Sequence, residues 1–373
     1  MLEIVLRPQL HKFDSCRGFA QEFALGQGDL IFTNKVIYQP FFAPLGTGAD
    51  VIFQERYGAG EPTDLMVERI MKDLAERADC KRIIAVGGGS VMDIAKVLAV
   101  ADGSGSVDAL YGKMPALSRR YELVLVPTTC GTGSEMTNIA ILDRVRLGSK
   151  MGLVSPALYA DCAVLIPELL SGLPYHVFAA SSIDALVHAV ESALSPKATD
   201  HTKLYSYEAI RLLIQGYQMI AREGPQACPE VFDPFLTAAN YAGIAFGTSG
   251  CATVHALSYP LSGKYHVAHG ESNYVFFLPT WRMYREHSGK GELDRLERYL
   301  ARMLQCRAED VCDELERLLQ RILPYRRLRD HGVKRGELEQ FAADVLEHQG
   351  RLLSNSMIPL DLNSILQLYQ RCY

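Results

Sequence analysis

A glycine-rich turn between a strand and a helix constrains the fold of this chain more than any other feature of its 373 residues. Residues 82–86 read Arg-Ile-Ile-Ala-Val, Gly87-Gly-Gly-Ser90 follows, and residues 90–100 carry apolar side chains at helical spacing. Glycines let a backbone approach a phosphate closely, and the helix that follows offers free N–H groups and a favourable dipole. The segment is neither Gly-x-Gly-x-x-Gly nor a P-loop, because no Gly-Lys-Ser/Thr follows. It predicts a pyrophosphate-binding loop in an α/β domain.

The rest of the first half alternates strands with helices, which implies a parallel sheet covered on both faces. Strands are predicted at residues 30–33, 49–53, 82–86, 122–126 and 162–166, helices at 61–74 and 90–100, and a hairpin at 138–145 and 150–154. From about residue 168 the spacing is helical, as in residues 209–220, 293–305, 311–323, 337–353 and 362–371. We therefore predict an α/β dinucleotide-binding domain at 1–167 and an all-helical metal-binding, catalytic domain at 168–373.

Two other segments follow predicted strands and suit a nucleotide. Pro127-Thr-Thr-Cys-Gly-Thr-Gly-Ser-Glu135 is dense in hydroxyls and glycines, which suits hydrogen bonds to ribose and phosphate. Asn34 follows the strand at 30–33, where a carboxylate would hold an adenosine ribose diol and repel a 2′-phosphate. Because its side chain is neutral, Asn34 excludes neither NAD nor NADP.

Four potential metal ligands lie in the second half. Asp184 and His188 are four residues apart in a predicted helix and therefore point the same way, and His255 and His269 form a second pair. One carboxylate and three imidazoles suit a borderline divalent ion, Fe²⁺ or Zn²⁺. Since the ligands and the glycine loop fall in different predicted domains, we expect the active site in the cleft between them. A metal site plus a dinucleotide loop predicts metal-assisted hydride transfer.

Composition narrows the class of protein. A formal net charge of −5 gives no general attraction to nucleic acid or anionic membranes, and no apolar stretch is long enough for a signal peptide or a membrane span. Nine scattered cysteines without a Cys-x-x-Cys pair fit a reducing compartment. We expect a cytoplasmic protein.

Taken together, these motifs resemble the iron-containing, group III metal-dependent alcohol dehydrogenases. The resemblance rests on the segments at residues 87–96, 127–135, 183–191 and 255–270 and extends over essentially the whole chain. It implies a dehydroquinate-synthase-like fold, in which an α/β nucleotide domain is followed by a helical metal domain. It also implies a homodimer.

The resemblance assigns residues to positions of the family. Asp184, His188, His255 and His269 fall on the metal-ligand positions. Cofactor positions are Gly88, Gly89 and Ser90 in the first loop, to which the glycine turn itself adds Gly87, then Thr128, Thr129, Thr132 and Ser134 in the second loop, and Lys150 at the ribose. Asp93 and Lys96, one turn into the helix after the glycines, either contact the cofactor or pair locally.

One departure from the family concerns the proton relay. Many members carry a second histidine four residues after the third metal ligand, and this chain has Tyr259 there. Three routes stay open: the Tyr259 hydroxyl, the His266 imidazole, or water and ribose hydroxyls. His266 can equally serve only to orient its loop.

Within the family the chain is most similar to members that interconvert 4-hydroxybutyrate and succinate semialdehyde. The resemblance therefore implies NAD-dependent oxidation of a small hydroxy acid to an aldehyde, with NADP not excluded. Another small alcohol, such as propanediol, butanol or glycerol, is the nearest alternative. A dehydroquinate-synthase-type lyase and a non-catalytic nucleotide- or metal-binding protein rank lower, the lyase because no basic cluster surrounds the metal motifs. Lys264 is a candidate for holding a substrate carboxylate, although an exposed lysine there needs no such role.

Overall fold

The structure is a computed structural model that describes residues 2–58, 60–103, 105–287 and 291–373. It divides into two compact units at Leu173 and Pro174, and the described residues before Leu6 belong to the second unit. The predicted domain boundary at 167/168 lies close to this division. Between the two positions runs a 3₁₀ helix, Pro167–Gly172.

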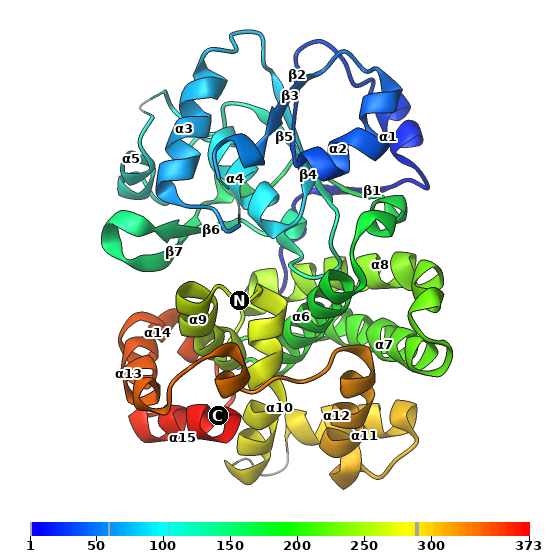
Figure 1. Cartoon of the computed structure of the whole chain (residues 1–373), viewed down its shortest axis with the longest axis vertical. Helices are drawn as coiled ribbons and strands as arrows, with labels where there is room; N and C mark the ends of the chain where they lie inside the picture. Colours follow the sequence, from blue (N-terminus) through cyan, green and yellow to red (C-terminus); the bar gives the residue numbers. More distant parts are fainter. Residues whose placement is uncertain (1, 59, 104, 288–290) are drawn as a thin grey trace. The chain divides into compact units, whose positions relative to one another are not determined.

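The first unit is built on a six-stranded sheet in the order β1-β8-β5-β4-β2-β3, with every pair parallel (Figure 1). Its strands are β1 (Gln9–Lys12), β2 (Asp29–Thr33), β3 (Asp50–Phe53), β4 (Arg82–Gly87), β5 (Glu122–Pro127) and β8 (Cys162–Leu165). A separate antiparallel hairpin joins β6 (Ile139–Arg144) to β7 (Ser149–Val154). The predicted α/β class, the central strands and the hairpin are confirmed.

Helices cover both faces of the sheet, as parallel strands require. The helices of this unit are α1 (Cys16–Glu22), α2 (Lys35–Phe41), α3 (Asp64–Ala75), α4 (Gly89–Ala99) and α5 (Val107–Gly112). Leu30 and Phe32 of β2 pack with α3 and α4 on one face, and Ile31 packs with α1 on the other. All residues of β2 are therefore buried, which explains the apolar run Leu30-Ile-Phe32 at its centre.

The edge strand β1 was not predicted. Its residues Gln9-Leu-His-Lys12 are largely exposed and carry no apolar run, so neither strand pattern is present. The strand exists because its backbone pairs with β8 in register Gln9↔Cys162. The formation of this edge strand therefore depends on pairing with a strand more than a hundred residues later in the sequence.

In the second unit, the described residues of 174–287 and 291–373 form helices joined by loops and contain no strand. Its helices are α6 (Tyr175–Leu194), α7 (Asp200–Glu223), α8 (Cys228–Ser249), α9 (Thr253–Tyr265), α10 (His269–His287), α11 (Glu292–Leu304), α12 (Val311–Ile322), α13 (Leu338–His348), α14 (Gly350–Leu353) and α15 (Leu362–Cys372). The predicted helix at 337–353 is divided in two at Gln349.

Helix α6 is the central helix of this unit. It is apolar around most of its circumference and packs against α7, α8 and α10 (Figure 1). By length and composition alone it could cross a membrane, but 89% of its apolar window is buried inside the protein. The polar residues that α6 buries are therefore unusual, and two of them are predicted metal ligands.

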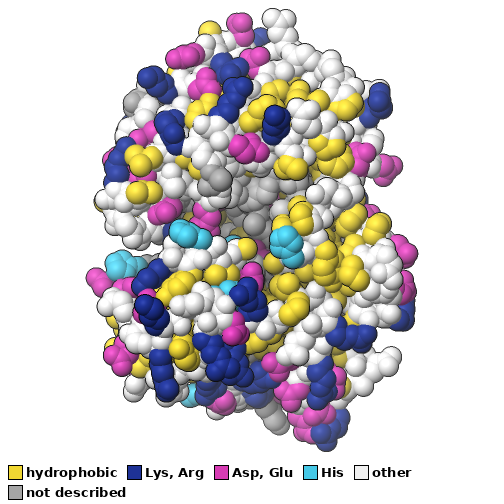
Figure 2. Space-filling view, viewed as in Figure 1, with side chains coloured by type: hydrophobic (Ala, Val, Ile, Leu, Met, Phe, Trp, Pro, Cys, Tyr) yellow, Lys and Arg dark blue, Asp and Glu magenta, His cyan; other side chains and the backbone are white. Residues whose placement is uncertain are grey.

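Acidic and basic side chains are interspersed over the face seen in Figure 2. Ion pairs on the surface of the protein include Arg282 with Asp313 and Glu316, and Arg371 with Glu286. Exposed pairs of this kind add little stability but keep the surface polar.

Candidate functional site

The structure brings together the four predicted metal ligands. One potential ligand atom from each of Asp184, His188, His255 and His269 lies within 4.8 Å of the other three. The side chains of the first three are almost completely buried, whereas that of His269 is 32% exposed. A small molecule would therefore reach this cluster from the side of His269.

Three helices supply the cluster, and close packing sets their spacing. Asp184 and His188 are one turn apart on α6, His255 lies in the first turn of α9, and His269 begins α10. Next to His269, a Cβ atom at Gly270 would lie 2.2 Å from the backbone oxygen of Ala180 on α6. Only glycine lets α10 approach α6 this closely.

Glu191 orients one of the ligands and was not predicted from the sequence. Its carboxylate accepts backbone N–H bonds from Ala252 (2.8 Å) and Val254 (2.5 Å) and lies 2.7 Å from Nδ1 of His255. An ionised carboxylate only accepts, so Nδ1 of His255 carries the proton and the lone pair of Nε2 faces the cluster. The signal was present, because Glu191 lies seven residues after Asp184 and three after His188, on the same face of α6.

Asn273 was also missed, although it lies one turn after His269 on α10. Its Nδ2 donates to Oδ1 of Asp184 (2.7 Å) and lies 3.1 Å from Nε2 of His255 and 3.2 Å from Nε2 of His269. Thus the amide hydrogens point into the place where the lone pairs of three ligands converge.

The residues fit a bound divalent cation. Nε2 of His188 lies 2.9 Å from Nε2 of His255, so two ring nitrogens face each other across the cluster, and Nδ1 of His188 is buried with no hydrogen-bond partner among the described residues. Burial lowers the pKa of His188 to about 3, which keeps this imidazole neutral. Burial opposes ionisation of Asp184, but the three imidazoles and the Asn273 amide hold its pKa below the ordinary value. One anionic oxygen among imidazole lone pairs is a ligand set for Fe²⁺ or Zn²⁺.

The two candidate relay residues differ in their setting. Tyr259 is half-buried and lies one turn after His255 on α9. His266 is exposed and ends α9 in a left-handed conformation with φ 53°, which turns the chain toward His269. This geometry favours a loop-orienting role for His266. Which residue relays a proton stays a prediction.

Lys264, the candidate for holding a carboxylate, forms an ion pair with Glu337. Glu337 also accepts a hydrogen bond from the hydroxyl of Tyr265. The ammonium of Lys264 is therefore already paired within the protein, and the lysine has a structural role at the end of α9.

The two predicted nucleotide loops lie side by side at the carboxyl edge of the sheet. Strands β4 and β5 are neighbours in register Gly87↔Pro127, and the backbone N–H of Thr128 donates to the oxygen of Gly87 (3.0 Å). A Cβ atom at Gly89 would lie 2.8 Å from Cγ2 of Thr132, so glycine at this position lets the two loops approach closely. Gly88 precedes α4 as its N-cap, which leaves the free N–H groups of that helix at the loop.

A buried lysine joins helix α4 to the second loop and the residues that follow it. Nζ of Lys96 is fully buried and donates to Oγ of Ser134 (2.6 Å), Oγ1 of Thr137 (2.9 Å) and the backbone oxygen of Ile139 (2.8 Å). Burial lowers the pKa of Lys96 against the attraction of Asp93. The Asp93 carboxylate also accepts from Oγ of Ser134 (2.6 Å).

Three predicted cofactor residues therefore have partners within the protein. Asp93 and Ser134 belong to the network around Lys96, and Lys150 of β7 pairs with Glu61. Their contacts hold the second loop and the hairpin in place. Direct contact of any of them with a cofactor stays a prediction.

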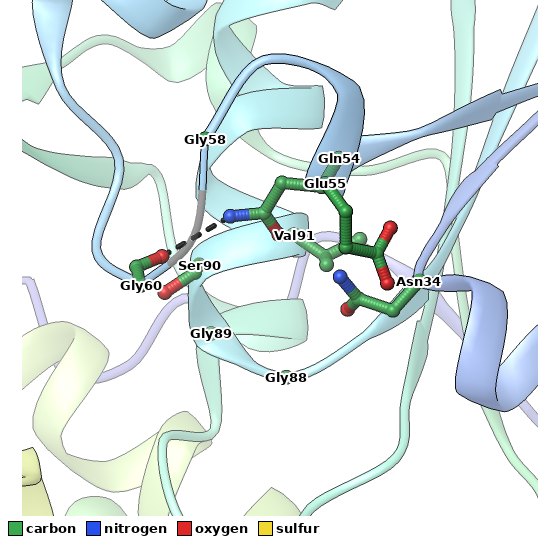
Figure 3. Close-up of a pocket in the computed structure, with 9 residues that line it drawn as sticks. All are labelled: Asn34, Gln54, Glu55, Gly58, Gly60, Gly88, Gly89, Ser90 and Val91. Carbon is green, nitrogen blue, oxygen red and sulfur yellow. Dashed lines mark hydrogen bonds between the residues drawn. The ribbon is translucent and has the colours of Figure 1, made fainter.

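A pocket of about 290 Å³ lies over the glycine loop (Figure 3). It is lined by Asn34, Gln54, Glu55, Gly58, Gly60, Gly88, Gly89, Ser90 and Val91. Asn34 and three of the four loop residues were predicted for the cofactor, whereas Gln54 and Glu55 were missed. Both directly follow β3, the neighbour of β2, so the rule that picked out Asn34 applied to them as well.

Sequence comparisons place these features in a family. The profile of the "Iron-containing alcohol dehydrogenase" family matches residues 14–167, and that of the "Fe-containing alcohol dehydrogenase family, C-terminal" matches residues 178–373. The chain is 44% identical over 368 residues to a 4-hydroxybutyrate dehydrogenase of Clostridium kluyveri, covering 99% of both chains. It is 33% identical to long-chain-alcohol dehydrogenase 1 of Geobacillus thermodenitrificans, covering 91% of this chain and 89% of that protein.

Solved structures share the fold. A 1,3-propanediol oxidoreductase superposes with a TM-score of 0.87 at 23% identity, covering both chains completely. A sulfoacetaldehyde reductase from Bifidobacterium kashiwanohense in complex with NAD⁺ gives 0.84 at 20% identity, over 100% of this chain and 99% of that one. Fold, motifs and full-length similarity agree, and the chain belongs to the family of iron-containing alcohol dehydrogenases and is an oxidoreductase.

Proposed function

We propose that the protein interconverts 4-hydroxybutyrate and succinate semialdehyde with NAD(H) and a divalent metal ion. The main support for this choice of substrate is the 44% identity to the Clostridium kluyveri enzyme over 99% of both chains. The convergence of Asp184, His188, His255 and His269 supports the metal requirement. The pocket over Gly88–Ser90 supports the dinucleotide.

In this proposal the residues of the second unit hold the reacting oxygen. Asp184 and the three histidines would hold the ion, and Glu191 keeps the Nε2 lone pair of His255 directed at it. A bound Fe²⁺ or Zn²⁺ polarises an alcohol or aldehyde oxygen. Because His269 is the exposed member, the substrate oxygen approaches beside it.

The residues of the first unit hold the cofactor. The N-terminus of α4 and Gly88–Ser90 bind the pyrophosphate, and the hydroxyls of Thr128, Thr129 and Thr132 hydrogen-bond to ribose or phosphate. A bound nicotinamide would accept the hydride that the alcohol carbon loses on oxidation, and the hydroxyl proton would leave separately. Tyr259, His266, or water with ribose hydroxyls would carry that proton.

The proposal also covers the function of each domain, the oligomeric state and the cellular compartment. We assign nucleotide binding to residues 1–167 and metal binding with catalysis to 168–373. We propose a homodimer that acts on a small hydroxy acid or aldehyde in the cytoplasm. None of the nine cysteines, all within the described residues, forms a disulfide, which supports a reducing compartment. Sedimentation of the purified protein tests the dimer.

The test of function is the appearance of reduced nicotinamide with metal-reconstituted protein. 4-Hydroxybutyrate and unsubstituted butanol are compared, each with NAD and with NADP. We expect turnover of the hydroxy acid and weak turnover of butanol. Equal or faster turnover of butanol would contradict the substrate assignment and favour the alternative represented by long-chain-alcohol dehydrogenase 1. No turnover of either despite bound metal would contradict the proposed activity.

A further inference from the structure

The pocket over the glycine loop contains one charged lining residue among those described, Glu55. Glu55 directly follows Gln54 at the end of β3, and Asn34 follows β2. Since these strands are parallel neighbours in register Thr33↔Phe53, Asn34 and Gln54 occupy matching positions at the strand ends. Figure 3 shows the Glu55 carboxylate beside the Asn34 amide, at the end of the pocket away from Gly60.

The backbone holds the Glu55 carboxylate in this position. Its Oε1 accepts the backbone N–H of Lys35, the residue after Asn34, at 2.9 Å. The side chain is exposed to solvent, so the carboxylate is accessible to a bound nucleotide. In contrast, the amide of Gln54 donates to the backbone oxygen of Gly60 (3.1 Å), which turns it toward the far wall of the pocket.

A carboxylate at this place in a dinucleotide domain has a defined chemical effect. When the pyrophosphate lies at the N-terminus of the helix after the glycines, the adenosine ribose lies over the end of the neighbouring strand. A carboxylate there accepts hydrogen bonds from the 2′- and 3′-hydroxyls and repels a 2′-phosphate. The neutral Asn34 cannot repel a phosphate, but Glu55 can.

We propose that Glu55 selects NAD over NADP, performing from β3 the task that a carboxylate at the position of Asn34 would perform from β2. The inference rests on the proposed dinucleotide function. Lys35 and Arg56 adjoin the pocket in sequence and could attract a 2′-phosphate, but neither lines it. Among the charged side chains near this pocket, the Glu55 carboxylate is therefore the one that would act most directly on a bound nucleotide.

Direct binding tests this without catalysis. NADH and NADPH are titrated, by their fluorescence, into the metal-loaded wild type and Glu55→Gln. The glutamine keeps an oxygen acceptor for Lys35 but has no charge. We expect NADPH affinity to rise about fivefold or more, because a charge beside a phosphate at a few ångströms contributes on the order of 1 kcal/mol even in water, which corresponds to about a factor of five. NADH affinity should fall several-fold.

Two further variants make the result specific. Glu22→Gln removes the same charge from an exposed position at the end of α1 and should leave the NADH-to-NADPH ratio unchanged. Asn34→Asp combined with Glu55→Gln returns a carboxylate to the pocket from β2 and should restore rejection of NADPH.

The outcomes separate the inference from the proposed function. Wild type that binds NADH and NADPH equally, or a ratio that Glu55→Gln leaves unchanged, would overturn the role of Glu55 while dinucleotide binding stands. Wild type that binds neither nucleotide would overturn both.

Discussion

Oε2 of Glu191 lies 2.7 Å from Nδ1 of His255, and this hydrogen bond joins α6 to α9 behind the metal ligands. The same carboxylate caps the first backbone N–H groups of α9, which have no partner within the helix. One buried side chain thus sets both the start of a helix and the tautomer of the histidine it carries. The metal cluster depends on a residue that is not itself a ligand.

We expect Glu191→Gln to weaken metal binding by about 10- to 100-fold, because the amide no longer offers two full acceptors to Val254, Ala252 and His255. Metal affinity is measured by competition with a chelator, and the helical content by circular dichroism. Glu339→Gln, at an exposed position on α13, is the control. A variant at Glu191 with wild-type metal affinity would show that His255 is oriented by other contacts.

Gly270→Ala tests the close approach of α10 to α6. Its Cβ atom would lie 2.2 Å from the oxygen of Ala180 and 3.2 Å from Cβ of Asp184, so one helix must move. We expect a loss of about 1–3 kcal/mol in the free energy of unfolding together with reduced metal content. Urea denaturation and metal analysis measure the two effects.

The matched control is Gly263→Ala on α9, where an added Cβ meets nothing within 4 Å. There alanine should stabilise the helix by up to about 1 kcal/mol. If both alanines behaved alike, close packing at Gly270 would not set the geometry of the cluster.

The contacts of Glu337 with the end of α9 should make the stability of the protein depend on pH in the acidic range. Its hydrogen bonds with Lys264, Tyr265 and the backbone of Lys334 lower its pKa from 4.5 to about 2. The unfolded chain binds this proton first as the pH falls. The stabilisation is therefore present above about pH 4.5 and is lost as the pH falls toward 2.

The thermal midpoint of the wild type should accordingly fall more steeply than that of Glu337→Gln over this pH window. Added salt should reduce the difference, because the pair is exposed. Parallel pH profiles for the two proteins would contradict the assignment.

The proton relay can be assigned with two variants. Tyr259→Phe removes only the hydroxyl, and His266→Gly removes the imidazole while preserving the left-handed backbone that glycine adopts readily. We expect Tyr259→Phe to lower kcat by on the order of a hundredfold and to alter its pH dependence. A changed pH profile in His266→Gly alone would assign the relay to His266, and two unchanged profiles would assign it to water and ribose hydroxyls.

Features encoded within short segments could be read from the sequence. The glycine turn after 82–86, the alternating strands and helices, and the i, i+4 pair Asp184 and His188 are local patterns, because each follows from the period of one element. They were sufficient to predict the α/β and helical classes and the pair Asp184 and His188. The family was predicted from the resemblance of four longer motifs, which also placed His255 and His269 on metal-ligand positions.

Tertiary structure decided what depends on distant partners. The edge strand Gln9–Lys12 forms only because β8 pairs with it. Likewise, the buried ammonium of Lys96 joins a helix to a loop about forty residues later, and Glu191 reaches an imidazole 64 residues away. Glu55 enters the pocket beside Asn34 because two strands are neighbours in the sheet. The periodicity of apolar residues indicates which face of a helix or strand is buried, but it does not indicate which other element packs against that face.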